Sequence, residues 1–424
     1  MTSAVPHLTT ALNGPLLELE AHLLERQADV ECWLREQWLK TPAPFYASVD
    51  LRNSGFKLAP VDTNLFPAGF NNLNPSFMPL CVQAAQAAVE RLCPKARRVL
   101  IIAENHTRNL FYLESVETLR DIFEKAGLEA RIASLRDDIK EPITVELPSG
   151  KICEISPLER QGNRVAIGDF SPCLVLMNND MSGGQPAILE NLEQELAPPL
   201  KAGWSTRKKS DHFTHYAMVA HAFAEQIGID PWLVSPLSLQ CGEVNFMERN
   251  GMECLARNVN TLLTAIQNKY DQYGIDREPF VVLKADSGTY GMGIMMVKSA
   301  DELLNLNRKQ RTKMSSAKEG LVVDNVLIQE GVYTFETLGE DEAVAEPVIY
   351  MMDHFVIGGF YRVHTGRGVD ENLNAPGMHF EPLAFAQSCI TPDKFDKPDA
   401  EPNRFYAYGV IARLALLAAA RELA

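Results

Sequence analysis

A lysine and a glycine-rich loop stand between two short apolar runs, residues 280–283 and 294–297. Glycines let backbone N–H groups approach an anion closely, and a lysine at the end of a strand adds a point charge beside them. The pattern predicts a hairpin that covers phosphates; the alternative is an ordinary β-hairpin with a glycine-rich turn. The glycine order differs from both common phosphate-binding motifs, so the loop alone does not decide between the two. The residues assigned to the anion are Lys284, Ser287, Gly288, Gly291 and Gly293.

Four oxygen-bearing side chains crowd the segment 366–377, GRGVDENLNAPG. Carboxylate and amide oxygens at this density suit a hard cation such as Mg²⁺, which keeps several waters and binds through substrate phosphates. Mn²⁺ is the alternative cation, and an Asn/Asp turn without a metal is the competing interpretation. The predicted ligands are Asp370, Glu371, Asn372 and Asn374.

The segment 50–74, DLRNSGFKLAPVDTNLFPAGFNNLN, mixes charged and amide side chains and shows neither a helical nor a strand period. A long irregular segment in a compact chain is often functional. Groups of both charges suit a zwitterionic amino acid, and Arg52 could bind its α-carboxylate through two N–H groups. The alternative is that Arg52 holds the segment itself, through carbonyls or an internal carboxylate. The residues assigned to the substrate are Asp50, Arg52, Asn53, Lys57, Asp62, Asn64 and Asn71.

The first half of the chain supplies an α/β pattern after one long amphipathic helix over residues 15–39. Buried strands are predicted at 97–104, 128–134 and 171–180, with a helix at 113–127, a hairpin at 143–155 and a helix at 186–196. Polar residues at the carboxyl ends of such strands, here Asn178, Asn179 and Asp180, lie where open α/β sheets bind ligands. Ordinary loop polarity explains them equally well.

The second half predicts a helix after a basic turn at Lys208 and Lys209, and another helix over residues 258–273 that leads into the glycine hairpin. Lys209 is expected to face a ligand. Strands are predicted at 322–329, 345–352 and 354–363, with helices at 301–306 and 405–423. His212 and His215 have no third ligand near them in sequence, so they predict no metal site.

Composition indicates a water-soluble protein of two or three domains and excludes several partner classes. The chain has 424 residues, 46% of them hydrophobic, and a net charge of −15, which argues against nucleic acid as a partner. It has neither a signal-peptide pattern nor an apolar run of membrane-spanning length. Its eight cysteines form no CxxC pair, so they are expected to be reduced thiols of a cytoplasmic protein. Oligomeric state is not predicted.

The order of these motifs resembles the ATP-grasp superfamily, most closely the glutathione-synthetase-like ligases. The shared order is a lysine-ended strand with a glycine loop, the tetrapeptide QEGV at 329–332, Arg362 and then Asp370-x-Asn372. The resemblance implies that Lys284 and Arg362 are catalytic, on the phosphates and the transferring phosphoryl group. It also implies an adenine site and a Mg²⁺ site. The adenine contacts would be Gln329, Glu330 and Val332, with Lys209 as a further ATP contact.

The segment 50–72 extends the resemblance to nearly the whole chain, because DLRNSGFKLAPVDTNLFPAGFNN is similar to a signature of a bacterial glutamate–cysteine ligase family built on an ATP-grasp scaffold. This implies an α/β chain with three parts. Residues 1–95 would hold an N-terminal helix and the substrate loop, 96–200 a pre-ATP-grasp-like parallel sheet, and 201–424 the ATP-grasp domain.

The resemblance implies a reaction of three small molecules. ATP, L-glutamate and L-cysteine would give γ-glutamylcysteine, ADP and phosphate through an acyl phosphate, as the first step of glutathione biosynthesis. The alternatives are another ATP-grasp carboxylate–amine ligase and, from a different class, a nucleotide-binding regulatory protein without activity.

Overall fold

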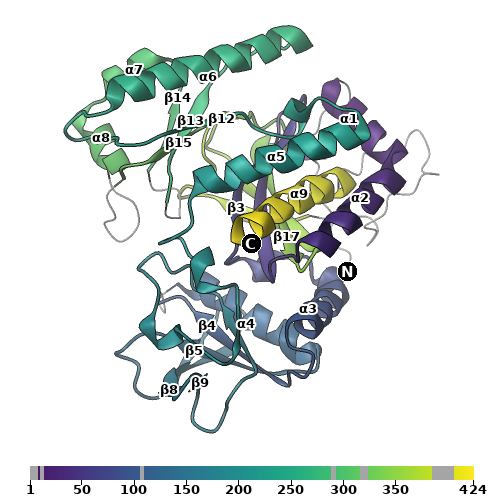
Figure 1. The fold of residues 1–424 in the computed structure, drawn as a ribbon, viewed down its shortest axis with the longest axis vertical. Helices are drawn as coiled ribbons and strands as arrows, with labels where there is room; N and C mark the ends of the chain where they lie inside the picture. Colours follow the sequence, from purple (N-terminus) through teal and green to yellow (C-terminus); the bar gives the residue numbers. More distant parts are fainter. Residues whose placement is uncertain (1–7, 10–13, 106–108, 288–292, 316–322, 384–404) are drawn as a thin grey trace.

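The computed structural model describes residues 8–9, 14–105, 109–287, 293–315, 323–383 and 405–424. Within these ranges the chain forms a mixed α/β structure built around three larger sheets, which confirms the predicted fold class (Figure 1). None of the described helices is long and apolar enough to cross a membrane. Gly288 and Gly291 lie outside the described residues.

The largest sheet joins the two ends of the chain. Strand β2 (Tyr46–Asn53) pairs with β3 (Leu58–Asn64) on one side and with β17 (Ala343–Met352) on the other. Beyond β17 follow β18 (Phe355–His364) and β19 (His379–Pro382), while β16 (Thr337–Leu338) and β1 (Leu8–Thr9) extend the other edge. All these pairs are antiparallel. The sheet therefore brings segments some 300 residues apart into direct hydrogen bonding.

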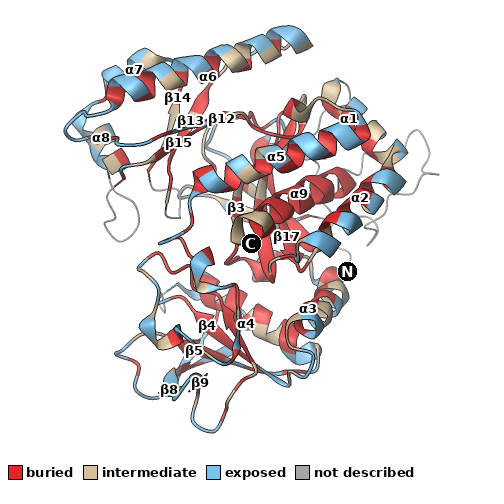
Figure 2. Ribbon diagram, in the orientation of Figure 1, coloured by how far each residue is buried: buried red, intermediate tan, exposed pale blue. Residues whose placement is uncertain are grey.

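Four helices cover one face of this sheet: α1 (Pro15–Glu25), α2 (Gln27–Lys40), α5 (Lys209–Ile227) and α9 (Phe405–Leu423). Figure 1 shows α9 between α2 and α5, and α9 contacts β2, β3 and β17. Its side chains are buried almost all round (Figure 2), as expected of an Ala/Leu-rich helix enclosed between a sheet and other helices. The opposite face of the sheet carries α3 (Met78–Leu92) and the polar residues of the site.

A second sheet, at the bottom of Figure 1, has the order β11-β10-β4-β5-β7-β6. Strands β4 (Arg98–Ala103), β5 (Glu129–Ser134), β7 (Ile152–Pro157), β10 (Leu174–Met177) and β11 (Glu195–Ala197) are parallel, and β6 (Ile143–Glu146) is antiparallel to β7. Helix α4 (Leu110–Lys125) connects β4 to β5. A small hairpin, β8 (Glu159–Gln161) and β9 (Arg164–Ala166), lies outside this sheet.

The third sheet holds the lysine-ended strand. Its antiparallel order is β12 (Ser238–Cys241), β15 (Val326–Glu330), β13 (Val281–Ala285) and β14 (Ile294–Val297). Helix α6 (Met252–Tyr273) packs on one face with residues such as Leu255, Val259, Leu262 and Ile266, which recur at helical spacing. The other face is left for the site. The short helices α7 (Ala300–Leu304) and α8 (Arg308–Ser315) follow β14.

Three local predictions were wrong. The helix over 15–39 is broken at Arg26, whose φ of −95° and ψ of 15° separate α1 from α2. Residues 186–196 form a 3₁₀ turn (Ala187–Leu189) and β11 instead of one helix. Segment 50–74 is largely regular, because β2 and β3 occupy most of its first half. Its strand period is hidden since both faces of β2 are buried, so polar and apolar residues do not alternate simply.

Candidate active site

A small cavity lies between the third sheet and the end of the largest sheet. One wall comes from β13, β14 and β15, which present Val282, Lys284, Ile294, Met296 and Gln329 on one face, as their cross-strand register requires. The facing wall is polar. The cavity between the two walls has a volume of about 110 Å³. The polar wall is formed by Asp50, Arg52, Asp62, Glu346, Arg362, Asp370, Asn372 and Asn374, with Val61, Glu330 and Val332.

Lys284 reaches across this cavity to the largest sheet. The pairing of β2 with β3 shifts register between Asp50 and Leu51, so Val61 is an extra residue in a β-bulge. Its carbonyl oxygen accepts a hydrogen bond from Lys284 Nζ. Burial lowers the pKa of Lys284 to about 8, although the nearby carboxylate of Asp62 opposes this change. Lys284 is therefore a desolvated cation, and an anionic ligand bound beside it would stabilise its charge.

A carboxylate–guanidinium cluster forms the centre of the polar wall. Arg362 Nη1 donates to Asp50 Oδ2 at 2.9 Å and to Glu346 Oε1 at 2.6 Å. Glu346 and Arg362 are direct cross-strand partners, as are Asp50 and Asp62. Burial alone would raise the pKa of Glu346, but Arg52 and Arg362 outweigh it and keep that pKa below its usual value. Arg362 is thus held between two acids in the wall of the cavity.

Arg52 holds three parts of the site together. Its Nε donates to Glu346 Oε2 at 3.1 Å, its Nη1 to the carbonyl of Val332 at 3.1 Å and its Nη2 to the carbonyl of Glu371 at 2.6 Å. All three nitrogens of the guanidinium are therefore engaged, so the assignment of Arg52 to a substrate carboxylate is not favoured by the geometry. The alternative set out from the sequence, in which Arg52 binds carbonyls and an internal carboxylate, is the arrangement observed.

A second, larger cavity of about 630 Å³ adjoins the first. Its floor is the largest sheet, with Ser48, Val348, Tyr350 and Phe360, and opposite lie the carboxyl ends of β4 and β10. There the polar lining residues are Glu104, Asn109, Tyr112, Asn178 and Asp180, beside Asn64, Asn71, Asn72 and Trp204. Asp50, Asp62, Arg362 and Asn374 line both cavities. These four residues therefore mark the place where the two spaces meet.

Three buried N–H donors in the cavity walls have no hydrogen-bond partner among the described residues. They are Gln329 Nε2 in the small cavity, Trp204 Nε1 in the large one and Arg362 Nε at the junction. Buried donors are almost always paired in proteins, since an unpaired one costs free energy. All three are donors, so they indicate a ligand rich in oxygen or other acceptor atoms.

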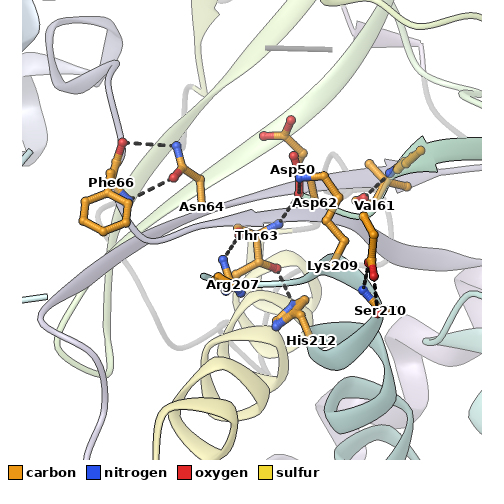
Figure 3. Close-up of polar contacts among 12 residues, drawn as sticks. Asp50, Val61, Asp62, Thr63, Asn64, Phe66, Arg207, Lys209, Ser210 and His212 are labelled. Carbon is orange, nitrogen blue, oxygen red and sulfur yellow. Dashed lines mark hydrogen bonds and ion pairs between the residues drawn. The ribbon is translucent and has the colours of Figure 1, made fainter. Parts of the chain in front are cut away.

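Figure 3 shows Asp62 close to Asp50 and to Lys209. Lys209 Nζ lies 3.8 Å from Asp62 Oδ1 and 3.6 Å from the ring centre of Trp204. Burial alone would raise the pKa of Asp62, but Lys209, Lys284 and Arg207 outweigh it and lower that pKa. Lys209 thus acts on the site through Asp62 and lines neither cavity.

Several residues assigned from the sequence lie away from both cavities. Lys57 is completely buried, with Nζ 2.7 Å from Glu330 Oε2 and 4.3 Å from the ring centre of Trp232, so it cannot reach a substrate. The Glu330 carboxylate also accepts from Trp232 Nε1 and the Leu237 N–H, and the Glu330 N–H donates to the Leu237 carbonyl at 2.7 Å, which leaves only its carbonyl for adenine. Asn53 Oδ1 accepts the N–H of Gly55 and closes the β2–β3 turn.

Other assigned residues have structural partners. Asn64 turns its amide onto the N–H and carbonyl of Phe66, as Figure 3 shows, although it lines the large cavity. Gly293 has a φ of +63°, and a Cβ there would lie 2.9 Å from that of Ala285, so close strand approach requires this glycine. Ser287 lines neither cavity, whereas Asn71 lines the large one.

The acid/amide segment faces the small cavity in part. Asp370, Asn372 and Asn374 line it, with Asp370 Oδ2 also 3.0 Å from Lys298 Nζ. The Glu371 carboxylate is turned toward Arg367 and the N–H of Gly368, so the structure does not bring it to the cavity. No cluster of three or more acidic, His or Cys side chains suited to a metal was found among the described residues.

Glu346 is one of the site residues that the sequence reasoning did not assign. It stands alone as an acid inside the apolar strand AVAEPVIYMM, and its partner across the strands is Arg362. A single acid within an apolar strand is unusual, so Glu346 could have been identified from the sequence as a candidate site residue. The aromatic floor of the large cavity, Tyr350 and Phe360, carried no signal because aromatic residues in strands usually form core.

A buried ion-pair cluster holds Thr63, near the end of β3, in place. The carboxylate of Glu422, near the end of α9, accepts from Arg207 Nε at 2.8 Å and contacts His212 Nδ1 at 3.2 Å. Arg207 also donates to the Thr63 carbonyl at 2.7 Å, and His212 Nε2 lies 2.9 Å from Thr63 Oγ1 (Figure 3). The cluster positions Thr63 and therefore its neighbour Asp62.

We expect Glu422→Gln to lower the free energy of unfolding at pH 7 by about 3 kcal/mol. Burial alone would raise the pKa of Glu422, but Arg207 and His212 lower it to about 2, from 4.5 for the free group. A lowered pKa stabilises the fold fully above pH 4.5, and this contribution is lost as the pH falls through 2. Urea unfolding at several pH values should therefore show a wild-type advantage that shrinks below pH 4.5. The exposed Glu340→Gln is the control, and a pH-independent difference for Glu422→Gln would contradict the assignment.

Comparison with known proteins identifies the family. The model of the glutamate–cysteine ligase family matches residues 20–423. A protein from Methylobacillus flagellatus KT, whose crystal structure carries the provisional name gamma-glutamylcysteine synthetase, is 62% identical. Its TM-score is 0.91, over 99% of this chain and 98% of that chain. A glutathione synthetase-like effector from Globodera pallida is 11% identical, with a TM-score of 0.40 over 87% and 85% of the two chains, which is too distant to support an argument. The comparison with curated proteins gave no match.

A mixed α/β chain with buried cations beside a large polar cavity suits an enzyme of anionic small molecules, and the matching family narrows this class to the ligases. The chain belongs to the glutamate–cysteine ligase family. It is accordingly an enzyme that ligates glutamate and cysteine, with ATP as the energy source, and the predicted family and activity are confirmed.

Proposed function

We propose that this enzyme makes γ-glutamylcysteine through an acyl phosphate formed where its two cavities meet. The main support is that both cavities are lined by Asp50, Asp62, Arg362 and Asn374. A ligand in one cavity can therefore react with a ligand in the other. A carboxylate oxygen is a poor leaving group, and phosphorylation by ATP converts it to a good one. The γ-carboxylate of glutamate attacks the terminal phosphorus of ATP, ADP leaves, and the amine of cysteine then displaces phosphate.

The small cavity is assigned to the nucleotide. Val282, Ile294 and Met296 offer an apolar surface for a flat base, and Gln329 supplies an unpartnered amide N–H for a ring nitrogen. Lys284 is assigned to the phosphates and Arg362 to the transferring phosphoryl group. This division follows the motif order of the ATP-grasp superfamily. Because the open volume is only about 110 Å³, a whole nucleotide must extend beyond this cavity or separate the two sheets.

The large cavity is assigned to the amino acids. Its volume of about 630 Å³ lies within the range of small-molecule sites, and it combines amides, acids and aromatic rings. Glu104 and Asp180 at the strand ends suit an α-ammonium group, while Asn71 and Asn72 suit an α-carboxylate. Asp62, held anionic by the two lysines, closes the space toward the phosphates.

Mg²⁺ is assigned to Asp370 and Asn372, with Asn374 as a further oxygen donor. The donor set fits an ion that keeps waters and binds mainly through phosphates, because only one carboxylate of the segment lines the cavity. When bound, the ion would neutralise charge on the phosphates during transfer. Asp370→Asn should raise the Mg²⁺ concentration for half-maximal activity at least tenfold, measured by titration at saturating ATP, with Glu371→Gln as the matched control. Unchanged titrations for Asp370→Asn would place the ion elsewhere.

ADP release with each amino acid alone and in pairs tests the function. The proposal predicts rapid ADP release with L-glutamate and L-cysteine together and a product of the mass of γ-glutamylcysteine. L-Aspartate in place of L-glutamate is the control, since its shorter side chain would not bring the reactive carboxylate to the junction. Rapid release with a different pair, and none with glutamate and cysteine, would contradict it.

A further inference from the structure

Two carboxylates stand side by side at the junction of the cavities. Asp50 and Asp62 are direct cross-strand partners in β2 and β3, so their side chains point to the same face of the sheet. Both line the small cavity and the large one. The reacting carbonyl carbon must also lie at this junction, because it is shared between the nucleotide and the amino acids.

The two carboxylates differ in what occupies their oxygens. Asp50 Oδ2 accepts from Arg362 Nη1 at 2.9 Å, and the described residues give its Oδ1 no hydrogen bond. Asp62 Oδ1 accepts the N–H of Thr63 at 3.1 Å and lies 3.8 Å from Lys209 Nζ. Each acid therefore has one oxygen that receives no hydrogen bond from the described residues. Asp50 is held through its other oxygen by Arg362, and Asp62 by its own strand with Lys209 nearby.

The charged groups around the two acids differ. The groups that face Asp50 are Arg52 on its own strand, Asp62 on β3, Glu346 on β17, Arg362 on β18 and Lys284 on β13. Burial raises the pKa of Asp50, and Glu346 and Asp62 add to this rise although Arg362 opposes it. Lys209, Lys284 and Arg207 instead keep the pKa of Asp62 low. Neighbouring acids whose pKa values are driven apart commonly divide the work of binding charge and moving a proton.

The second half of the reaction requires a proton acceptor. An amino acid enters as an ammonium ion, which has no lone pair with which to attack the acyl phosphate. After one proton leaves, the nitrogen lone pair forms the C–N bond, and the C–O bond to phosphate breaks with its electron pair going to phosphate. A second proton leaves the nitrogen as the amide forms.

We propose that Asp50 is the general base that takes the proton from the acceptor amine, while Asp62 remains anionic and holds the ammonium ion in place. This inference rests on the proposed function, because it assigns a catalytic residue within that reaction. The other acids of the large cavity are less suited. Glu104 Oε1 accepts the Asp180 N–H, Asp180 Oδ1 accepts from Ser182, and neither residue lines the small cavity.

Competition between two acceptors tests this role. Hydroxylamine is already uncharged at neutral pH, so it can capture the acyl phosphate as γ-glutamyl hydroxamate without a general base. At pH 7, Asp50→Asn should lower kcat with cysteine by at least a hundredfold, the usual contribution of a general base. Its hydroxamate formation should fall by less than about tenfold.

Asp62→Asn is the matched control, since it removes the same charge one strand away. It should lower kcat with cysteine and with hydroxylamine to a similar extent, because Asp62 positions the acceptor and pairs with the charges of Lys209 and Lys284. An equal loss with both acceptors in Asp50→Asn would overturn the proposal and leave Asp50 as a support for Arg362. If wild-type enzyme formed no hydroxamate from glutamate and ATP, the proposed acyl phosphate itself would fail, and this inference with it.

If Asp50→Asn does not fold, the pH dependence of kcat for the wild-type enzyme tests the role of Asp50 instead. With cysteine, kcat should fall at acidic pH as Asp50 becomes protonated, at a pH above the ordinary pKa of an aspartate. With hydroxylamine at saturation, kcat should lack this decline. The same acidic limb with both acceptors would overturn the assignment.

Discussion

Lys284→Ala should reduce kcat/KM for ATP by about a thousandfold, the upper range for loss of one preorganised group that stabilises developing charge. Lys284 enters the small cavity from β13 and meets the carbonyl of Val61 at the β-bulge, so its charge lies opposite the acids of the largest sheet. Burial has already lowered its pKa to about 8, which shows how much solvation the ammonium group has lost. A phosphate group would supply the missing interaction.

Folding and catalysis must be separated for this variant. Its thermal transition should stay close to that of the wild type, because removing a desolvated cation costs the core little. The exposed Lys201→Ala is the control and should retain activity. Steady-state kinetics with ATP varied at saturating amino acids, combined with thermal melting, gives both readouts. A Lys284→Ala enzyme with normal ATP kinetics would remove the nucleotide from this cavity.

Arg362→Lys should lower kcat by at least a hundredfold while the protein remains folded. The guanidinium bridges Asp50 and Glu346 through Nη1, and its Nε has no hydrogen-bond partner among the residues that the structure describes. An ammonium group can neutralise the two acids, yet it lacks the planar arrangement of donors that meets a phosphoryl group as well. The loss should therefore fall on turnover more than on stability.

Arg362→Ala should instead destabilise the protein by about 3 kcal/mol, because the partly buried Asp50 loses its ion pair and the buried Glu346 keeps only Arg52. Arg91→Lys is the control for the lysine variant, since Arg91 in α3 pairs at 2.7 Å with Asp353 in the β17–β18 turn but lines neither cavity. Urea unfolding and kinetics of the three variants should separate the two effects. Full activity in Arg362→Lys would contradict a role in phosphoryl transfer.

The sequence predicted those elements whose signal is local. The buried strands β4 and β10 follow from continuous apolar runs, helix α4 ends before the predicted stop at Gly127, and the lysine-ended strand became β13. Lys284, Gln329, Arg362 and Asp370, which the motif order grouped together, line one cavity. The predicted domain boundaries at residues 95 and 200 remain predictions.

Long-range pairing explains what could not be predicted. β2 and β3 sit beside β17, so the partners of Arg52 and Lys57 come from residues 330–371 and are invisible in a local reading. A charged residue in a segment without helical or strand periodicity is easily assigned to a ligand, because its partner inside the protein cannot be identified from the sequence. The same applies to Glu346, whose significance depends on Arg362 across the strand.

Isotope transfer tests the acyl phosphate most directly. L-Glutamate carrying ¹⁸O in both γ-carboxylate oxygens is turned over with ATP and L-cysteine, and the released phosphate is analysed by mass spectrometry. If the γ-carboxylate attacks the terminal phosphorus, each phosphate will carry one ¹⁸O atom and ADP none. Unlabelled phosphate alongside complete conversion to γ-glutamylcysteine would contradict the account.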